Sequence, residues 1–303
     1  MLLSEAVILS KNISIVNEKG GCGKTTTAYN LAQGLYLQGY KVLGIDMDSQ
    51  GNFSSTWGSN PECIGAFDIL MHGETAKDAI QEGEGKFDLI SGDRFLKDFA
   101  AKTGFDVNFM LHDALLPIEA EYDFIIIDTP PAVATLTTNA MMSSHYVIIP
   151  AAPESYSVDG LVQLNESIHA IQLHGVSDRK LRILGILLTR YRKGTRLAGD
   201  MAEIIKVVAE KIGTRVFDRV IRENMAIKEA QAAKKSVLDY QKYSNGATDY
   251  RAFVAEVLAD VREDCGGRIR KVKNQKSAED EKSEPEEPAE LVIQPDRMEE
   301  GTE

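Results

Sequence analysis

Cysteine, tryptophan and long apolar runs are scarce in this 303-residue chain. Its three cysteines, Cys22, Cys63 and Cys265, are too far apart to suggest a disulfide framework or a zinc site. No apolar run approaches the roughly 20 residues of a membrane-spanning helix, and no basic segment precedes the first apolar residues as in a secretory signal. These absences favour a cytoplasmic protein with no membrane partner.

Positive charge is also in deficit, because 46 acidic residues outnumber 34 lysines and arginines for a net charge of -12. Residues 276–303 hold eleven acidic and three basic residues, so most of this imbalance belongs to the C-terminal end. Few apolar side chains there offset the entropy of ordering it. We predict one domain over 1–265 and an acidic, disordered tail over 266–303. Nucleic-acid binding would need a local basic patch.

Short apolar runs alternate with helical patterns through the rest of the chain. This alternation predicts an α/β fold, with a mostly parallel, doubly wound sheet and helices on both faces. In such a sheet, ligands bind at the carboxyl ends of the strands. The strands are predicted at 13–17, 41–46, 87–90, 124–128, 146–149 and 183–188, and the clearest helices at 25–37, 155–173, 199–212 and 244–261.

A glycine-rich loop follows the first predicted strand and reads NEKGGCGKTTT over residues 17–27. Its glycines let the backbone bend so that successive N–H groups surround phosphate oxygens, and the helix that begins near Lys24 adds the positive end of its dipole. Lys24 would reach the β- and γ-phosphates, and the Thr25 hydroxyl would bind Mg²⁺. Thr26 would donate to the α-phosphate side. The loop therefore predicts a site for a nucleoside triphosphate.

Two further predicted strands end in aspartates. Asp46 and Asp48 are two residues apart, so their carboxylates point the same way, toward the phosphate loop. One can hold metal-bound water while the other orients the attacking water. Asp128 follows four apolar residues, as expected for an aspartate that contacts Mg²⁺ through water. The predicted metal site is Thr25, Asp46 and Asp128.

The strict G-x-x-x-x-G-K-T pattern fails, because Glu18 occupies its first position. Residues 19–26, KGGCGKTT, instead resemble the deviant Walker A motif of the ParA/MinD-type ATPases, with Cys22 at a position that is usually apolar. The resemblance implies that Lys19 crosses an ATP-bound homodimer to contact the partner's nucleotide, as an arginine finger does. The resemblance also implies that the nucleotide-binding residues are Lys19, Gly20, Gly21, Cys22, Gly23, Lys24, Thr25 and Thr26.

The segment DMDSQGN at 46–52 resembles the Asp-x-Asp-Pro-Gln-Gly-Asn loop of the partition ATPases, with Ser49 in place of the proline. This resemblance makes Asp48 the hydrolytic residue and Asp46 a supporting one. The implied catalytic residues are Lys19, Lys24 and Asp48. The adenine is expected near 150–153 and 188–191.

Residues between Val220 and Tyr250 resemble the partition branch, ParA/Soj, and the likeness covers about 12–262. The resemblance implies a nucleoid-associated ATPase that hydrolyses ATP slowly with Mg²⁺, whose ATP-bound dimer binds DNA without sequence preference and whose hydrolysis a ParB-type centromere-binding partner stimulates. The family's DNA face lies partly at 219–228, where Glu223 and Ala226 replace common arginines. The remaining candidate DNA contacts are Arg190, Arg192, Arg219, Arg222 and Lys228.

Three other functions remain to be weighed. A MinD-like, membrane-associated positioning ATPase needs a C-terminal amphipathic helix, but 266–275 contains only Ile269 and Val272 as apolar anchors. An iron–sulfur reductase needs cysteines that bridge two subunits, and none lies between Cys63 and Cys265. A nucleotide-dependent regulator of a mobile element would bind nucleotide at the same site, and ATP hydrolysis would be incidental to its role.

Overall fold

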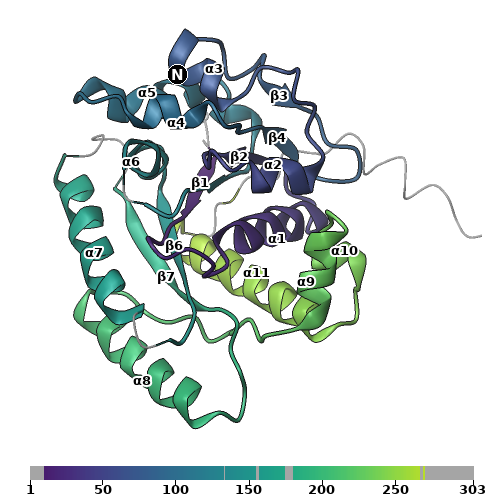
Figure 1. Ribbon diagram of the computed structural model, residues 1–303, viewed down its shortest axis with the longest axis vertical. Coiled ribbons are helices and arrows are strands. Elements are labelled where there is room, and N and C mark those ends of the chain that lie inside the picture. The colour runs from purple at the N-terminus through teal and green to yellow at the C-terminus, as the bar shows by residue number, and fades with distance from the viewer. Residues whose placement is uncertain (1–9, 133, 155–156, 175–179, 267–268, 270–303) are drawn as a thin grey trace, which may run out of the picture. The chain divides into compact units, whose positions relative to one another are not determined.

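Seven strands of the computed structural model form one sheet in the order β3-β4-β2-β5-β1-β6-β7 (Figure 1). The structure describes residues 10–132, 134–154, 157–174, 180–266 and 269. All neighbouring strands pair in parallel except β3 and β4, which pair antiparallel at one edge. The strands are β1 (Lys11–Ile15), β2 (Val42–Asp46), β3 (Ile80–Gln81), β4 (Asp88–Ile90), β5 (Phe124–Asp128), β6 (Tyr146–Ala151) and β7 (Arg182–Leu188).

Helices cover both faces of the sheet, and Figure 1 shows α1 and α11 on the face opposite α4 and α5. The longest helices are α1 (Lys24–Leu37), α7 (Ser157–His174), α8 (Arg196–Lys211) and α11 (Asn245–Asp264). The shorter ones are α2 (Asn52–Trp57), α3 (Ala66–His72), α4 (Leu96–Ala100), α5 (Met110–Leu115), α6 (Thr135–Met142), α9 (Met225–Ala232) and α10 (Val237–Tyr240), with 3₁₀ turns η1 (Asp106–Phe109) and η2 (Glu119–Glu121).

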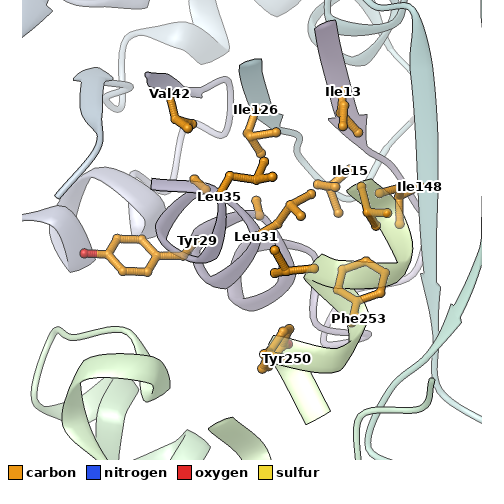
Figure 2. Close-up of a cluster of buried hydrophobic side chains, with 14 of the residues drawn as sticks. Ile13, Ile15, Tyr29, Leu31, Leu35, Val42, Ile126, Ile148, Tyr250 and Phe253 are labelled. Atoms are coloured by element: carbon orange, nitrogen blue, oxygen red, sulfur yellow. The ribbon is translucent and has the colours of Figure 1, made fainter. Parts of the chain in front are cut away.

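Alternate residues of each central strand enter different cores, because successive strand side chains point to opposite faces. Ile126 of β5 packs with α1 and α11 in one core, whereas Ile125 and Ile127 pack with α3 to α6 in another. Figure 2 shows the first core, in which Leu31 and Leu35 of α1 lie beneath the sheet. Every residue of β5 is buried, which is why residues 124–127 form an unbroken apolar run in the sequence.

The predicted α/β fold is confirmed, and each predicted strand and helix has a counterpart whose ends agree within three residues. The antiparallel β3 was not predicted, because two residues are too short to show a period of two. Helices α2 to α6, α9 and α10 were also missed, since none exceeds eight residues. The predicted tail lies outside the described residues except for Gly266 and Ile269, so the domain boundary stays a prediction.

Phe53 and Trp57 are buried packing residues of α2. No helix in the described part of the chain has the length and apolar character needed to cross a membrane.

Candidate nucleotide-binding site

A cavity of about 740 Å³ opens where the glycine loop after β1 meets the ends of β2 and β7. Helix α9 and the segment before it form another part of the wall. The lining combines backbone of a glycine turn with cationic and amide side chains, which suits a phosphorylated ligand. Among the lining residues are Gly20, Gly21, Gly23, Lys24, Thr25, Thr26, Asp48, Asn52, Thr189, Arg190, Arg222, Asn224, Lys228, Gln231 and Tyr250.

The glycine loop has the backbone conformation that its sequence predicts. Gly21 and Gly23 have φ values of 72° and 93°, in the left-handed region that side chains disfavour, and α1 begins directly afterwards at Lys24. The buried Lys24 ammonium donates to the carbonyl oxygen of Lys19 at 3.0 Å. The Thr189 hydroxyl, just past β7, donates to the carbonyl oxygen of Cys22 at 2.6 Å. The loop is therefore held from both sides.

Asp46 and Asp128 end two adjacent strands and lie opposite each other in the β2–β5 register, both fully buried. The Asp46 carboxylate accepts hydrogen bonds from the Ser54 amide and hydroxyl, at 2.9 and 2.7 Å, and from the Asp48 amide at 3.0 Å. Burial raises the pKa of Asp46 to about 6 in spite of these bonds. These three protein donors fix the orientation of the Asp46 carboxylate.

Neither carboxylate oxygen of Asp128 has a hydrogen-bond partner among the described residues. Burial raises the pKa of Asp128 well above its usual range, and the neighbouring Asp46 raises it further, while the Thr25 hydroxyl opposes the shift. A buried carboxylate without a partner costs free energy unless a cation compensates it. The pairing of Thr25 with Asp128 therefore fits Mg²⁺.

The described residues contain no group of three or more His, Cys, Asp or Glu side chains that could hold a metal ion. A site made of one hydroxyl and one or two carboxylates suits Mg²⁺, because Mg²⁺ commonly keeps water and takes phosphate oxygens as its other ligands.

Asp48 lies on the cavity wall beside the glycine loop and is only 7% exposed. Its Oδ1 accepts a hydrogen bond from the Gln50 amide at 3.0 Å, which closes the turn that leads to α2. The turn forms with Ser49 where the family has proline, so the substitution leaves the aspartate in the expected loop.

Lys19 and Cys22 belong to the glycine loop but are not among the residues that line the cavity. The Lys19 ammonium instead forms an ion pair with Glu154, just past β6, with 2.5 Å between Nζ and Oε2. This hydrogen bond is the main reason that the pKa of Glu154 is lowered, and Arg190 and Arg192 contribute. Glu154 could not be identified from the sequence, because 135 residues separate it from Lys19 and no local spacing signals the pair.

The candidate DNA contacts divide into two groups. Arg192 and Lys228 both bind Glu223, and Arg222 pairs with Asp249. The hydrogen bonds from Arg192 and Lys228 lower the pKa of Glu223 to about 2. Among the described residues, Arg190 and Arg219 form no ion pair, and the Arg190 guanidinium contacts the carbonyl oxygen of Gly21 at 3.4 Å. Three of the five predicted cations are therefore partly neutralised by carboxylates.

The parallel sheet, the glycine loop leading into α1 and the aspartates at the ends of β2 and β5 define a P-loop nucleoside triphosphatase. The model of a family described as an AAA domain matches residues 10–183. The chain is 34% identical to the chromosome partitioning protein ParA of Caulobacter vibrioides over 83% of its length and 95% of the relative's. It is 34% identical to the sporulation initiation inhibitor protein Soj of Bacillus subtilis over 83% and 100%.

Two solved structures share the fold. Cobyrinic acid a,c-diamide synthase from Mycobacterium smegmatis, with bound ADP and magnesium, superposes with a TM-score of 0.72 at 25% identity, covering 87% of this chain and 99% of that one. A putative plasmid partition protein from Borrelia burgdorferi bound to AMPPNP gives a TM-score of 0.69 at 27% identity, covering 84% and 99%.

The chain belongs to the ParA/Soj family of partition ATPases, as its motifs predicted. It is an ATP hydrolase that uses ATP and Mg²⁺. Membership in the family supports a role as a partition ATPase.

Proposed function

We propose that two copies of this protein bind ATP as a dimer, associate with DNA without sequence preference on the nucleoid, and hydrolyse ATP slowly until a ParB-type partner stimulates them. The dimer would segregate a chromosome, a plasmid or a mobile element. We assign the ATPase to residues 1–265.

One observation carries the proposal: Lys24, Thr25 and Asp48 line a single cavity, and the buried carboxylate of Asp128, which has no hydrogen-bond partner of ordinary geometry among the described residues, lies close to Thr25. Lys24 exchanges the Lys19 carbonyl for phosphate oxygens. Thr25 and Asp128 hold Mg²⁺, with Asp46 behind them, and the ion supplies charge stabilisation for the phosphates. Asp48 orients the attacking water as general base.

Lys19 is the group that we assign to the partner's nucleotide. Its ion pair with Glu154 is exposed, and exposed pairs contribute only about 0–1 kcal/mol. A triphosphate from a second copy is a stronger acceptor than one carboxylate, so dimerisation can draw Lys19 away from Glu154.

DNA binding is assigned to the exposed basic residues Arg219, Arg192 and Lys228, with Arg222 and Arg190 beside them. Phosphate contacts of this kind give sequence-independent, salt-sensitive binding, with dissociation constants on the order of 10⁻⁴ to 10⁻⁶ M. Glu223 reduces the net charge of this face, which favours the weaker end of that range.

Sedimentation of the full chain tests the proposal directly. With a non-hydrolysable ATP analogue and Mg²⁺ we expect a dimer that co-sediments with duplex DNA of arbitrary sequence at low salt, whereas with ADP we expect a monomer that does not. A chain that stays monomeric at high concentration with the analogue would overturn the dimer. A dimer that leaves the DNA unbound would overturn the DNA assignment alone.

A further inference from the structure

A side-chain hydrogen bond at the cavity wall joins helix α9 to the start of α1. The Nε2 atom of Gln231 donates to the hydroxyl oxygen of Thr26, with 2.5 Å between the two atoms. Both residues line the cavity, although 205 positions separate them in the sequence. Neither the phosphate-loop motif nor the aspartate motifs include Gln231.

Buried contacts set the position of this glutamine. Asn30, one turn after Thr26, donates to the Thr26 carbonyl oxygen at 2.7 Å and accepts from the Ser236 hydroxyl and the Val237 amide, at 2.8 and 3.0 Å. Asn30 and Ser236 are 4% and 1% exposed. These bonds tie α1 to the segment between α9 and α10, so Gln231 is held next to Thr26 whether or not their own hydrogen bond forms.

The direction of the Gln231–Thr26 bond controls what the hydroxyl can do. A threonine hydroxyl has one proton and can accept as well as donate. Because the amide nitrogen of Gln231 only donates, it occupies an acceptor position on the Thr26 oxygen and leaves the proton for another acceptor. Thr26 lines the nucleotide cavity, where its predicted acceptor is an oxygen of the α-phosphate.

We infer that Gln231 is a nucleotide-positioning residue that acts through Thr26, by orienting its hydroxyl as a donor to the α-phosphate. The inference rests on the proposed assignment of the cavity to ATP. ATP and ADP both carry an α-phosphate, and it does not react. The interaction is therefore the same in the ground state and the transition state, so it sets KM and leaves kcat unchanged.

Variants of matched shape test this inference. Gln231→Met keeps the length of the side chain and removes the donor, so we expect the Kd for both ATP and ADP, and the KM for ATP, to rise roughly threefold to tenfold with kcat unchanged. The carboxylate of Gln231→Glu can only accept at neutral pH, so the Thr26 hydroxyl would donate its hydrogen bond to this carboxylate and not to the α-phosphate. This variant should weaken the binding of both nucleotides more than Gln231→Met does. Gln163→Ala, on the exposed surface of α7, is the control and should match the wild type.

A double-mutant cycle separates action through Thr26 from a direct or structural effect. If Gln231 acts through Thr26, the Thr26→Ala variant and the Thr26→Ala/Gln231→Met double variant should bind nucleotide equally. Additive losses, an unchanged Kd in Gln231→Met, or a fall in kcat at constant KM would each overturn the inference.

Lys24→Ala distinguishes failure of the inference about Gln231 from failure of the proposed ATP site. If Lys24→Ala binds ATP normally, the cavity is not the ATP site, and both proposals fall. If Lys24→Ala loses ATP while Gln231→Met binds as the wild type does, only the role of Gln231 is wrong.

Discussion

The ammonium of Lys24 donates to the carbonyl oxygen of Lys19, five residues earlier in the same loop, at 3.0 Å. The acceptor is neutral, and the Lys24 side chain is buried. A hydrogen bond from an ammonium to a charged phosphate oxygen is stronger than one to a neutral carbonyl, so the triphosphate displaces this contact. The loop is thus closed on itself by the same lysine that we assign to the phosphates.

Replacing Lys24 with alanine should therefore abolish measurable ATP binding. We expect the Kd from isothermal titration to rise at least roughly 100-fold, since a buried, charge-assisted interaction is lost. Lys77→Ala, a change at an exposed lysine, is the matched control and should bind normally. Retention of wild-type affinity by Lys24→Ala would contradict the site.

Asp48→Ala should bind ATP and stop turning it over. Removal of a general base lowers kcat by roughly 10²- to 10⁴-fold, and the stalled protein should accumulate as a dimer in size-exclusion chromatography with ATP. Asp48→Asn is the control for the loop, because its side-chain oxygen can still accept from the Gln50 amide. Normal hydrolysis by Asp48→Ala would remove that residue from its assigned role.

Asp128→Asn should stabilise the protein in the absence of metal and nucleotide. The raised pKa of Asp128 means that the folded state binds this proton more tightly than the unfolded state, so ionisation opposes folding as the pH rises above about 4. We expect the variant's advantage in free energy of unfolding to grow from pH 4 to pH 8, reaching about 1–3 kcal/mol.

Urea denaturation at several pH values measures this difference. Mg²⁺ with ATP should stabilise the wild type more than the variant, which would narrow or reverse the ranking. A difference independent of pH would show that the Asp128 carboxylate is compensated by other means.

Lys19→Ala should bind ATP as a monomer. The Lys19 side chain lies outside the cavity lining, so its loss should leave the Kd for ATP within about twofold while it removes the charge supplied to the partner. Analytical ultracentrifugation with a non-hydrolysable analogue distinguishes the two forms. An ATP-bound dimer of Lys19→Ala would contradict a role in trans.

Glu223→Gln should strengthen DNA binding, because it releases Arg192 and Lys228 from their shared carboxylate. We expect log K for DNA binding to fall more steeply with log salt concentration, with a change in slope that corresponds to up to about two additional phosphate contacts. Glu229→Gln, on α9 next to Lys228 in the sequence, loses the same charge and is the control. A wild-type salt dependence in Glu223→Gln would show that these cations do not reach DNA.

The effect of Glu223 should not change with pH in the physiological range. The pKa of Glu223 is lowered to about 2, so its contribution to stability is complete above its ordinary pKa near 4.5 and is lost only as the pH falls toward 2. Fluorescence anisotropy with labelled duplex DNA should give the same ratio of affinities for the variant and the wild type from about pH 5.5 to pH 8.5. A ratio that changes there would indicate another titrating group.

The strands and long helices could be predicted because their signals are local. An unbroken apolar run such as 124–127 indicates a strand that is buried on both faces. Apolar residues that recur every three to four positions indicate a helix. The short helices could not be predicted, since a segment such as Val237–Tyr240 contains barely one turn and is fixed by the Ser236 cap and the contacts of Asn30.

The sequence alone identifies the glycine loop, its lysines and the three aspartates, because phosphate and Mg²⁺ chemistry demands those residue types at fixed positions after a strand. The contacts between distant side chains depend on the folded chain. Glu154 with Lys19, Glu223 with Arg192, and Gln231 with Thr26 come together across 135, 31 and 205 residues, because the order of strands in the sheet, and not spacing along the chain, sets which loops are neighbours.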